Sequence, residues 1–163
     1  MSEPRPSRPS MPRGYGIASG SEGLLPWSWA EERLVASRNY WIVSATDEGR
    51  PHAMPVWGLW LDGAVWFSSD PASRKARNIA GRPEIVVHLE SGDEVVIVKG
   101  RAEEVAERSQ LEPFAHGYEE KYGIRMDLDR PLGLTYRVRP GAVLAWREQD
   151  FPTTATRWSF GRG

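Results

Sequence analysis

The stretch Leu59-Trp60-Leu61-Asp62-Gly63-Ala64-Val65-Trp66-Phe67 decides the fold of this chain. Asp-Gly between two runs of apolar and aromatic residues is the strongest short-range signal for a two-residue hairpin turn. Strands joined by so short a turn are antiparallel, because parallel neighbours require a long crossover connection. The stretch therefore predicts an antiparallel pair, in which a strand over residues 53–61 is followed by one over residues 64–67.

Runs of similar composition on both sides extend this pair into a larger sheet. Further strands are predicted at residues 40–46, 84–89, 94–102, 134–140 and 142–146, the last as a seventh strand or a continuation of the sixth. Gly100 is expected to let its strand bend sharply, as small barrels require. Helices are predicted at residues 24–36, 70–80 and 103–122, the last interrupted by Pro113. Six or seven closely spaced strands with two to three short helices predict a small antiparallel barrel.

Composition narrows the class of protein. The chain has 163 residues, of which 40% are hydrophobic and 26% charged, as expected for one globular domain. Its net charge of −1 argues against nucleic-acid binding, because the surface as a whole is not basic. No apolar run approaches the roughly 20 residues that cross a bilayer, and no apolar signal core is visible, so a cytoplasmic protein without membrane contact is expected. Residues 1–23 are predicted to be a disordered or loosely attached tail before a domain over residues 24–163.

A short polar and basic stretch follows the strand at residues 64–67. It reads Ser68-Ser69-Asp70-Pro71-Ala72-Ser73-Arg74-Lys75-Ala76-Arg77-Asn78-Ile79. Asp70 is a candidate N-cap for the following helix, and Ser73 is a second candidate one turn further on. Hydroxyls, free backbone N–H groups, the positive helix end and the charges of Arg74 and Lys75 would suit an anion such as phosphate. The alternative is an ordinary capped helix with a solvated basic face.

Side chains that could carry catalysis by themselves are not apparent. His52, His88 and His116 show no metal-ligand spacing, and there are no cysteines, so no metal site is predicted. Trp57 and Trp60 are three positions apart on one strand and therefore face opposite sides, so one can line a site while the other packs inward. A bound cofactor that carries the chemistry would account for this pattern.

The order of motifs resembles a known family. His52-Ala53-Met54-Pro55-Val56-Trp57 is followed by Ser73-Arg74-Lys75-Ala76-Arg77-Asn78-Ile79, then by Arg82-Pro83-Glu84-Ile85-Val86-Val87 and finally by Thr156-Arg157-Trp158-Ser159-Phe160. This sequence is similar to the pyridoxamine 5′-phosphate oxidase-like split β-barrel family, and most similar to the branch that uses the deazaflavin coenzyme F420. The resemblance runs from about Tyr40 to Phe160. It implies a mainly β fold with a six- to seven-stranded antiparallel split β-barrel.

The resemblance also implies a homodimer with two cofactor sites at the subunit interface. The cofactor phosphate would be held by Ser73, Arg74, Lys75 and Asn78. The ring system would lie along Met54, Pro55, Val56 and Trp57, largely through backbone contacts. Ser68 and Ser69 would lie near the ring or the ribityl chain, and Trp158 would reach the site of the partner subunit.

The function expected from these observations is hydride transfer between F420 and a small organic acceptor. Two alternatives remain open at this point. One is an FMN-binding oxidase or flavin reductase of the same fold, because FMN and F420 share a three-ring core, a ribityl chain and a phosphate. The other is a protein that binds such a cofactor without turnover.

Overall fold

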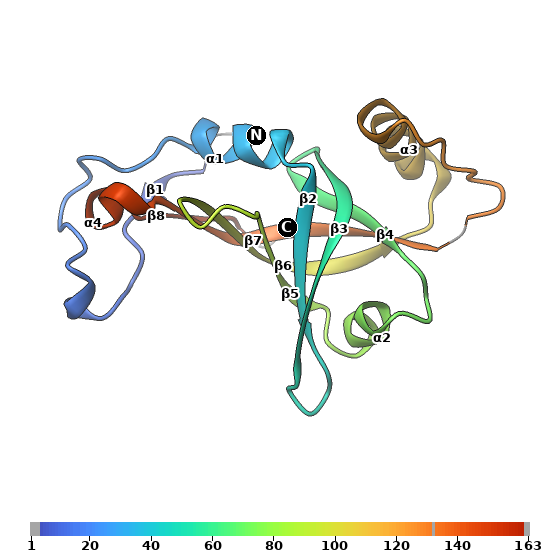
Figure 1. Ribbon diagram of the computed structural model, residues 1–163, viewed down its shortest axis with the longest axis horizontal. Coiled ribbons are helices and arrows are strands. Elements are labelled where there is room, and N and C mark those ends of the chain that lie inside the picture. The colour runs from blue at the N-terminus through green and yellow to red at the C-terminus, as the bar shows by residue number, and fades with distance from the viewer. Residues whose placement is uncertain (1–3, 132, 162–163) are drawn as a thin grey trace.

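Eight β-strands and four α-helices make up the computed structural model, which describes residues 4–131 and 133–161 (Figure 1). The strands are β1 (Pro6–Ser7), β2 (Asn39–Ala45), β3 (Pro51–Leu61), β4 (Ala64–Ser69), β5 (Glu84–His88), β6 (Glu94–Val105), β7 (Leu134–Arg147) and β8 (Thr156–Ser159). The helices are α1 (Trp27–Ala36), α2 (Arg74–Gly81), α3 (Arg108–Tyr122) and α4 (Phe151–Thr154), with short 3₁₀ turns η1 (Arg13–Tyr15) and η2 (Glu148–Asp150).

Six of these strands close into a barrel in which all neighbours are antiparallel. The sheet order is β1-β8-β7-β4-β3-β2-β5-β6, and β6 pairs back onto β7 to close the ring. The Asp62-Gly63 turn joins β3 to β4 as the sequence predicts, with both residues at positive φ. The predicted antiparallel split barrel is therefore confirmed, and the segment at residues 142–146 is the continuation of β7 rather than a seventh strand.

The long strand β7 explains how the barrel splits. Its first half pairs with β4 and its second half pairs with β8, whereas β6 follows the other edge along the whole length. The register of β6 against β7 shifts between Lys99 and Gly100, opposite Pro140, which cannot donate a backbone hydrogen bond. A Cβ atom at Gly100 would lie 2.3 Å from the carbonyl oxygen of Arg139, so only glycine permits this approach. The bend predicted at Gly100 is confirmed.

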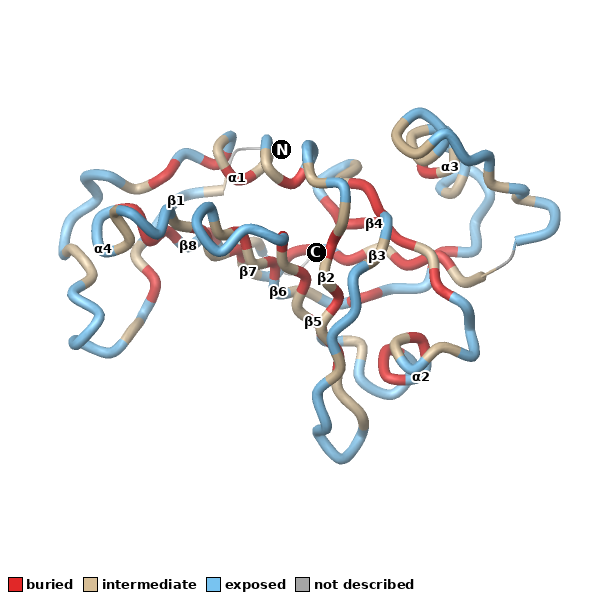
Figure 2. The backbone as a smooth tube through the Cα atoms, viewed as in Figure 1, coloured by how far each residue is buried: buried red, intermediate tan, exposed pale blue. Residues whose placement is uncertain are grey.

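The main core fills the barrel and is closed at one end by α1. Tyr40, Phe67 and Trp158 are among the largest fully buried side chains. From α1, the Trp27 ring lies 5.4 Å from the ring of Trp158 and 6.0 Å from that of Trp60. Figure 2 shows buried positions along β4 and β7, in contrast to the exposed tip of the β2–β3 hairpin.

A second, smaller core lies between α3 and the outer face of β3, β4 and β6. It consists of Leu59, Ala64, Trp66, Val105 and Phe114. Phe114 is fully buried, with its ring 5.8 Å from that of Trp66. Residues of β3 therefore alternate between two cores, because successive side chains of a strand point to opposite faces.

Three helices begin at residues other than those the sequence predicts. α1 begins at Trp27 instead of residue 24, because the preceding Pro26 has an extended backbone conformation. Residues 103–105 belong to β6 because they pair with β7, so α3 begins at Arg108 instead of residue 103. Pro113 lies inside α3 without ending it, since this exposed proline removes only one hydrogen bond near the start of the helix. α2 begins at Arg74, because Ser73 and not Asp70 provides the N-cap; the Asp70 carboxylate accepts from the N–H of Ala72 instead.

The described part of the N-terminal segment lies along the C-terminal segment. β1 pairs with β8, and the Arg8 guanidinium donates to the carbonyl oxygens of Thr153 and Ala155 at 2.5 and 3.1 Å. The division into a tail over residues 1–23 and a domain over residues 24–163 stays a prediction. Within the described ranges, each helix is too short or too polar to span a bilayer.

Candidate functional site

The barrel opens where β3 and β4 separate. Their pairing ends at Gly58 and Phe67, so Trp57 and Ser68 are the first residues beyond it on the two strands. Beyond this point β3 continues over Pro51–Trp57 with only β2 as its partner among the described strands, which leaves the backbone groups of its other edge free. Val56 and His52 are half-buried, and the other five residues of this segment are exposed: Pro51, Ala53, Met54, Pro55 and Trp57. This free edge is the first component of the candidate site.

Hydroxyl and ammonium groups gather on the opposite side of the split. The Oγ atoms of Ser69 and Ser73 are 2.8 Å apart, and Nζ of Lys75 donates to Oγ of Ser69 at 2.7 Å. Oγ of Ser73 also accepts from the backbone N–H of Ala76 and thereby caps α2. Burial lowers the pKa of Lys75, and the nearby charge of Asp70 opposes this shift. Ser69, Ser73 and Lys75, together with the N-terminus of α2, form an anion-binding arrangement.

Arg74 adds a second positive charge at the first position of α2. Its side chain is exposed, and within residues 4–131 and 133–161 no carboxylate forms an ion pair with Arg74 or Lys75. Two cations without an ion-pair partner beside a helix N-terminus favour a bound anion.

Two further predicted site residues, Ser68 and Asn78, form hydrogen bonds to neighbouring strands. Ser68 bonds to Oγ1 of Thr135 on β7 at 2.9 Å, at the end of the split. Asn78 is buried on α2, and its amide nitrogen donates to Oγ of Ser44 on β2, so its side chain joins the helix to the projecting hairpin.

Trp158 lies elsewhere in the chain. It is fully buried on β8, and its register partner Val143 is eight positions from Thr135 along β7, roughly 26 Å of strand. Its Nε1 has no hydrogen-bond partner among the described residues. The contact of Trp158 with a partner subunit's cofactor stays a prediction.

Sequence reasoning missed a group of residues at the C-terminal end of α3. The ring of Tyr122 stacks on that of Trp57, and Nζ of Lys121 donates to the carbonyl oxygen of Gly58 at 2.9 Å. Tyr118, Lys121 and Tyr122 are spaced i, i+3 and i+4, which places them on one face of a helix. That spacing was the available signal, but the many glutamates of this segment favoured a solvated helix.

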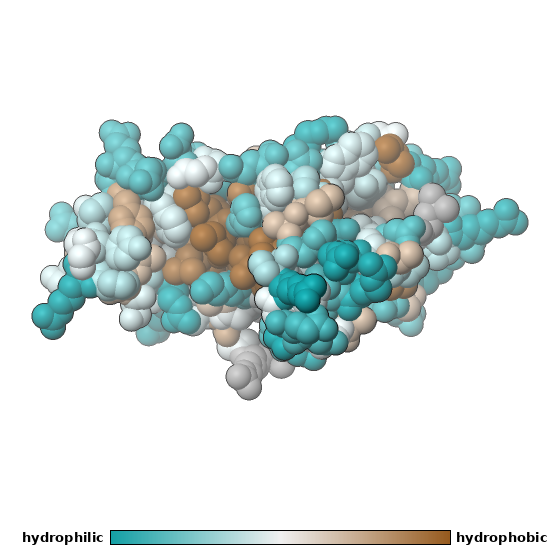
Figure 3. Space-filling model, turned by 60° about the horizontal axis from the view of Figure 1, so that its bottom comes forward, coloured by the Kyte–Doolittle hydropathy of each residue, from teal (hydrophilic) through white to brown (hydrophobic). Residues whose placement is uncertain are grey.

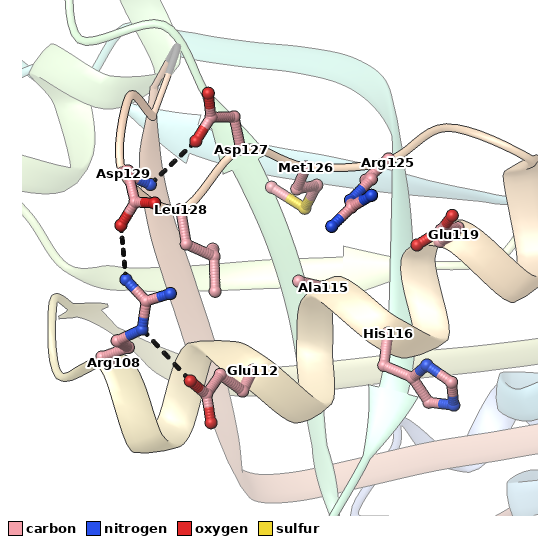
Figure 4. A pocket seen from close by; sticks show the side chains of 10 residues that line it. All are labelled: Arg108, Glu112, Ala115, His116, Glu119, Arg125, Met126, Asp127, Leu128 and Asp129. Atoms are coloured by element: carbon pink, nitrogen blue, oxygen red, sulfur yellow. Dashed lines mark hydrogen bonds and ion pairs between the residues drawn. The ribbon is translucent and has the colours of Figure 1, made fainter.

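A hollow of about 560 Å³ lies on the other side of α3, against residues 125–129 (Figure 4). Arg108 bridges the carboxylates of Glu112 and Asp129 there, at 3.1 and 2.6 Å. Arg125 also lines the hollow and forms no ion pair with a described residue, but no serine or threonine lines the hollow, so it lacks the hydroxyl donors of the α2 site. Among the described residues, no group of acidic, histidine or cysteine side chains could hold a metal ion.

Comparisons with known proteins agree with this architecture. A family model described as pyridoxamine 5′-phosphate oxidase matches residues 30–147. No curated protein matches the chain.

Several solved structures share the fold. The conserved hypothetical protein Rv2991 from Mycobacterium tuberculosis is 22% identical with a TM-score of 0.69, and the alignment covers 80% of this chain and 90% of that one. A protein described as an F420 reductase is 20% identical, with a TM-score of 0.54 and coverages of 69% and 94%. A heme binding protein from Mycobacterium smegmatis is 20% identical, with a TM-score of 0.58 and coverages of 76% and 55%. At these identities the likeness concerns the fold alone.

Proposed function

Because this chain belongs to the pyridoxamine 5′-phosphate oxidase family, we propose that it is a cytoplasmic oxidoreductase that binds F420 and transfers a hydride between F420 and a small organic acceptor. The observation that carries the proposal is the convergence of Ser69, Ser73 and Lys75 at the N-terminus of α2, beside the free edge of β3. The experiment that tests it is a comparison of F420 and FMN binding.

The donor set fits a phosphate ester. Ser69 and Ser73 supply hydroxyl donors, Lys75 and Arg74 supply charge-assisted donors, and the first turn of α2 supplies free backbone N–H groups. Charge-assisted hydrogen bonds of this kind are about twice as strong as neutral ones. We assign Ser73, Arg74 and Lys75 to the phosphate, with Ser69 between the phosphate and the ribityl chain. Asn78 lies one turn further on, and we assign it a supporting role because its amide already bonds to Ser44.

The ring system fits the free edge of β3. Met54, Pro55, Val56 and Trp57 present backbone groups there that no neighbouring strand uses. A planar ring placed against such an edge can exchange hydrogen bonds with the backbone, as an added strand would. Ser68 and Ser69 end the opposite strand, so we assign them to the ring or the ribityl chain.

The reaction needs little from protein side chains. When bound, F420 would supply the hydride chemistry, while the chain binds, orients and shields the reacting groups. The half-buried Val56 and the α3 residues near Trp57 would exclude water from one side of the ring. No side chain is assigned as a catalytic acid or base.

The choice of F420 over FMN depends on charge beyond the phosphate. F420 carries a lactyl-oligoglutamate tail with further negative charges, which favours positive groups near the phosphate site. Arg74 and Arg77 lie on α2 with exposed side chains, whereas Arg82 is partly engaged by Asp47. Arg8 is bonded to carbonyl oxygens of the C-terminal segment, so it does not contribute. Each exposed contact is worth about 0.2–1 kcal/mol, so several together produce a measurable preference.

Titration of the purified chain with F420 and with FMN tests the proposal. We expect low-micromolar or tighter F420 binding that weakens with added salt, because salt screens the contacts to the tail. FMN should bind more weakly, with a shallower salt dependence. Tight FMN binding without measurable F420 affinity would instead support the oxidase or flavin reductase alternative. F420 binding without turnover of any quinone or nitroaromatic acceptor would support a non-catalytic carrier.

We also propose that the protein is a homodimer. Opposing residues of four neighbouring strands form a row on the outer face of the sheet: Trp41, His88, Ile97 and Leu144. Each of these side chains is only half-buried in the single chain. Figure 3 shows apolar side chains gathered in the part of the molecule where β5, β6 and β7 lie. A second copy would cover this face, because a contiguous apolar surface is costly in water.

A further inference from the structure

An aromatic ledge lies beside the split, made by Trp57 on β3 and by Tyr118 and Tyr122 on α3. The rings of Trp57 and Tyr122 are parallel within 2° at a centroid distance of 4.7 Å. The ring of Tyr118 lies 4.7 Å from that of Tyr122 and 6.4 Å from that of Trp57. Trp57 has 37% of its surface exposed, whereas the next residue, Gly58, is buried. The ledge therefore presents the exposed part of Trp57, flanked by the half-buried rings of Tyr118 and Tyr122, to an incoming molecule.

The charge at this ledge is positive and uncompensated. The guanidinium carbon of Arg38 lies 5.3 Å from the centre of the Trp57 ring and 5.6 Å from that of Tyr122. Nζ of Lys121 lies 5.4 Å from the Tyr122 ring on the protein side of the ledge. No carboxylate within residues 4–131 and 133–161 forms an ion pair with Arg38 or Lys121. A bound anion could therefore approach these two cations without displacing a carboxylate that is already paired with them.

Backbone contacts hold the ledge in place. The hydroxyl of Tyr122 accepts from the N–H of Gly58 at 2.9 Å and lies 2.7 Å from the carbonyl oxygen of Arg38. Nζ of Lys121 donates to the carbonyl oxygens of Ser37 and Gly58 at 2.5 and 2.9 Å. Three elements, namely α3, β3 and the segment before β2, are thus fixed to one another. A surface ordered in advance loses less entropy when it binds a ligand.

The ledge also adjoins the segment to which we assign the cofactor ring. Trp57 ends that segment, and Ser68 faces it across the point where β3 and β4 separate. The side chain of Trp57 points to the α3 side of the sheet, as those of Leu59 and Leu61 do. A molecule stacked on the exposed surface of Trp57 would therefore lie beside the ring.

We propose that this ledge is the acceptor subsite and that it selects planar aromatic anions, with Arg38 as the residue that sets the preference for negative charge. That the bound molecule is the hydride acceptor rests on the proposed function. The preference for planar aromatic anions depends only on the residues of the ledge. The aromatic faces supply stacking, and the guanidinium supplies a donor pair for a carboxylate or sulfonate in the ring plane.

The experiment compares anthraquinone-2-sulfonate with the neutral, similarly shaped anthraquinone-2-sulfonamide, by calorimetry or quenching of tryptophan fluorescence. We expect the sulfonate to bind more tightly to the unliganded protein. Arg38→Gln should weaken sulfonate binding about threefold to tenfold and leave sulfonamide binding unchanged, because only the charged contact is lost. Trp57→Leu should weaken both ligands. Arg13→Gln, which removes the same charge from the exposed turn η1, is the matched control and should change neither affinity.

F420 affinity, measured in the same variants, separates the two proposals. Equal binding of the two quinones, or no effect of Arg38→Gln on a variant with an unchanged melting temperature, overturns the ledge proposal even where F420 binds as expected. If the protein does not bind F420 but prefers the sulfonate, and Arg38→Gln abolishes that preference, the anion-selective ledge is supported and the proposed function is wrong. If Arg38→Gln weakens both quinones equally, the role of Arg38 is structural and the proposal is wrong.

Discussion

The ammonium group of Lys75 lies 2.7 Å from the hydroxyl oxygen of Ser69, which joins the first turn of α2 to the last residue of β4. Ser69 is buried, and its hydroxyl also contacts that of Ser73. The cation therefore rests on hydroxyl groups in a half-buried position instead of on a carboxylate. Such a lysine stabilises a bound anion more than a freely solvated one would, because water screens it less.

Replacing Lys75 with alanine should weaken binding of F420 by about tenfold to a hundredfold, since a charge-assisted contact contributes about 1.5–3 kcal/mol. The melting temperature should change little, because Lys75 forms no ion pair with a described residue. Calorimetric titration with F420 or with FMN measures the effect. Lys99→Ala, at an exposed position of β6, is the matched control and should bind as the natural chain does. Unchanged affinity in both variants would mean that the basic face of α2 is only solvated.

The proposed dimer makes a separate prediction on the outer face of the sheet. Ile97 and Leu144 face each other in the centre of the apolar row. Ile97→Arg should place an unpaired charge in the interface and convert the protein to a monomer, because burying such a charge costs several kcal/mol. Light scattering at micromolar concentration should give about twice the chain mass of 18.4 kDa for the natural protein and about that mass for the variant. Glu104→Arg, also on β6, should remain dimeric. A natural protein that is already monomeric at that concentration would contradict the proposal.

Local sequence signals predicted most of the barrel and half of the site. The Asp62-Gly63 turn and the bend at Gly100 depend on backbone requirements of a few adjacent residues, and such requirements are visible in sequence. The Ser73 cap of α2 is equally local, although Asp70 competed with it.

The contact of Tyr122 with Trp57 was not predictable in the same way. It joins residues 65 positions apart, and it arises because Phe114 and its neighbours dock α3 on the outer face of the barrel. The pairing of Pro6 and Ser7 with β8 is another long-range contact, formed by a segment whose composition is typical of disordered chains. The helical spacing of Tyr118, Lys121 and Tyr122 indicates that they share a face but not what that face contacts, and the segment of Pro6 and Ser7 has no strand pattern, so both contacts needed the folded structure.

Lys121 combines burial with a lack of negative partners. Burial, the larger cause, and the positive charge of Arg38 together lower its pKa from 10.5 to about 8. The groups that face it are Arg38, Tyr40 and Tyr122, together with backbone carbonyl oxygens. Burial raises the pKa of both tyrosines, so they stay neutral where Lys121 titrates. Lys121 is therefore the group of this cluster that changes charge just above neutral pH.

The sign of the resulting pH dependence follows from proton linkage. Below about pH 8 Lys121 is protonated in both the folded and the unfolded chain, and the folded protein bears the full cost of the buried cation. Between about pH 8 and 10.5 the unfolded chain binds more protons than the folded one, so this site makes the free energy of unfolding rise with pH. The difference in unfolding free energy between the natural protein and Lys121→Met should therefore grow in favour of the natural protein from about pH 7 to 9.5, measured by urea denaturation. The same difference for Lys99→Met, at an exposed position, should stay flat, because that ammonium group meets water in both states. Parallel curves for the natural protein and Lys121→Met would show that Lys121 keeps an ordinary pKa in the folded chain.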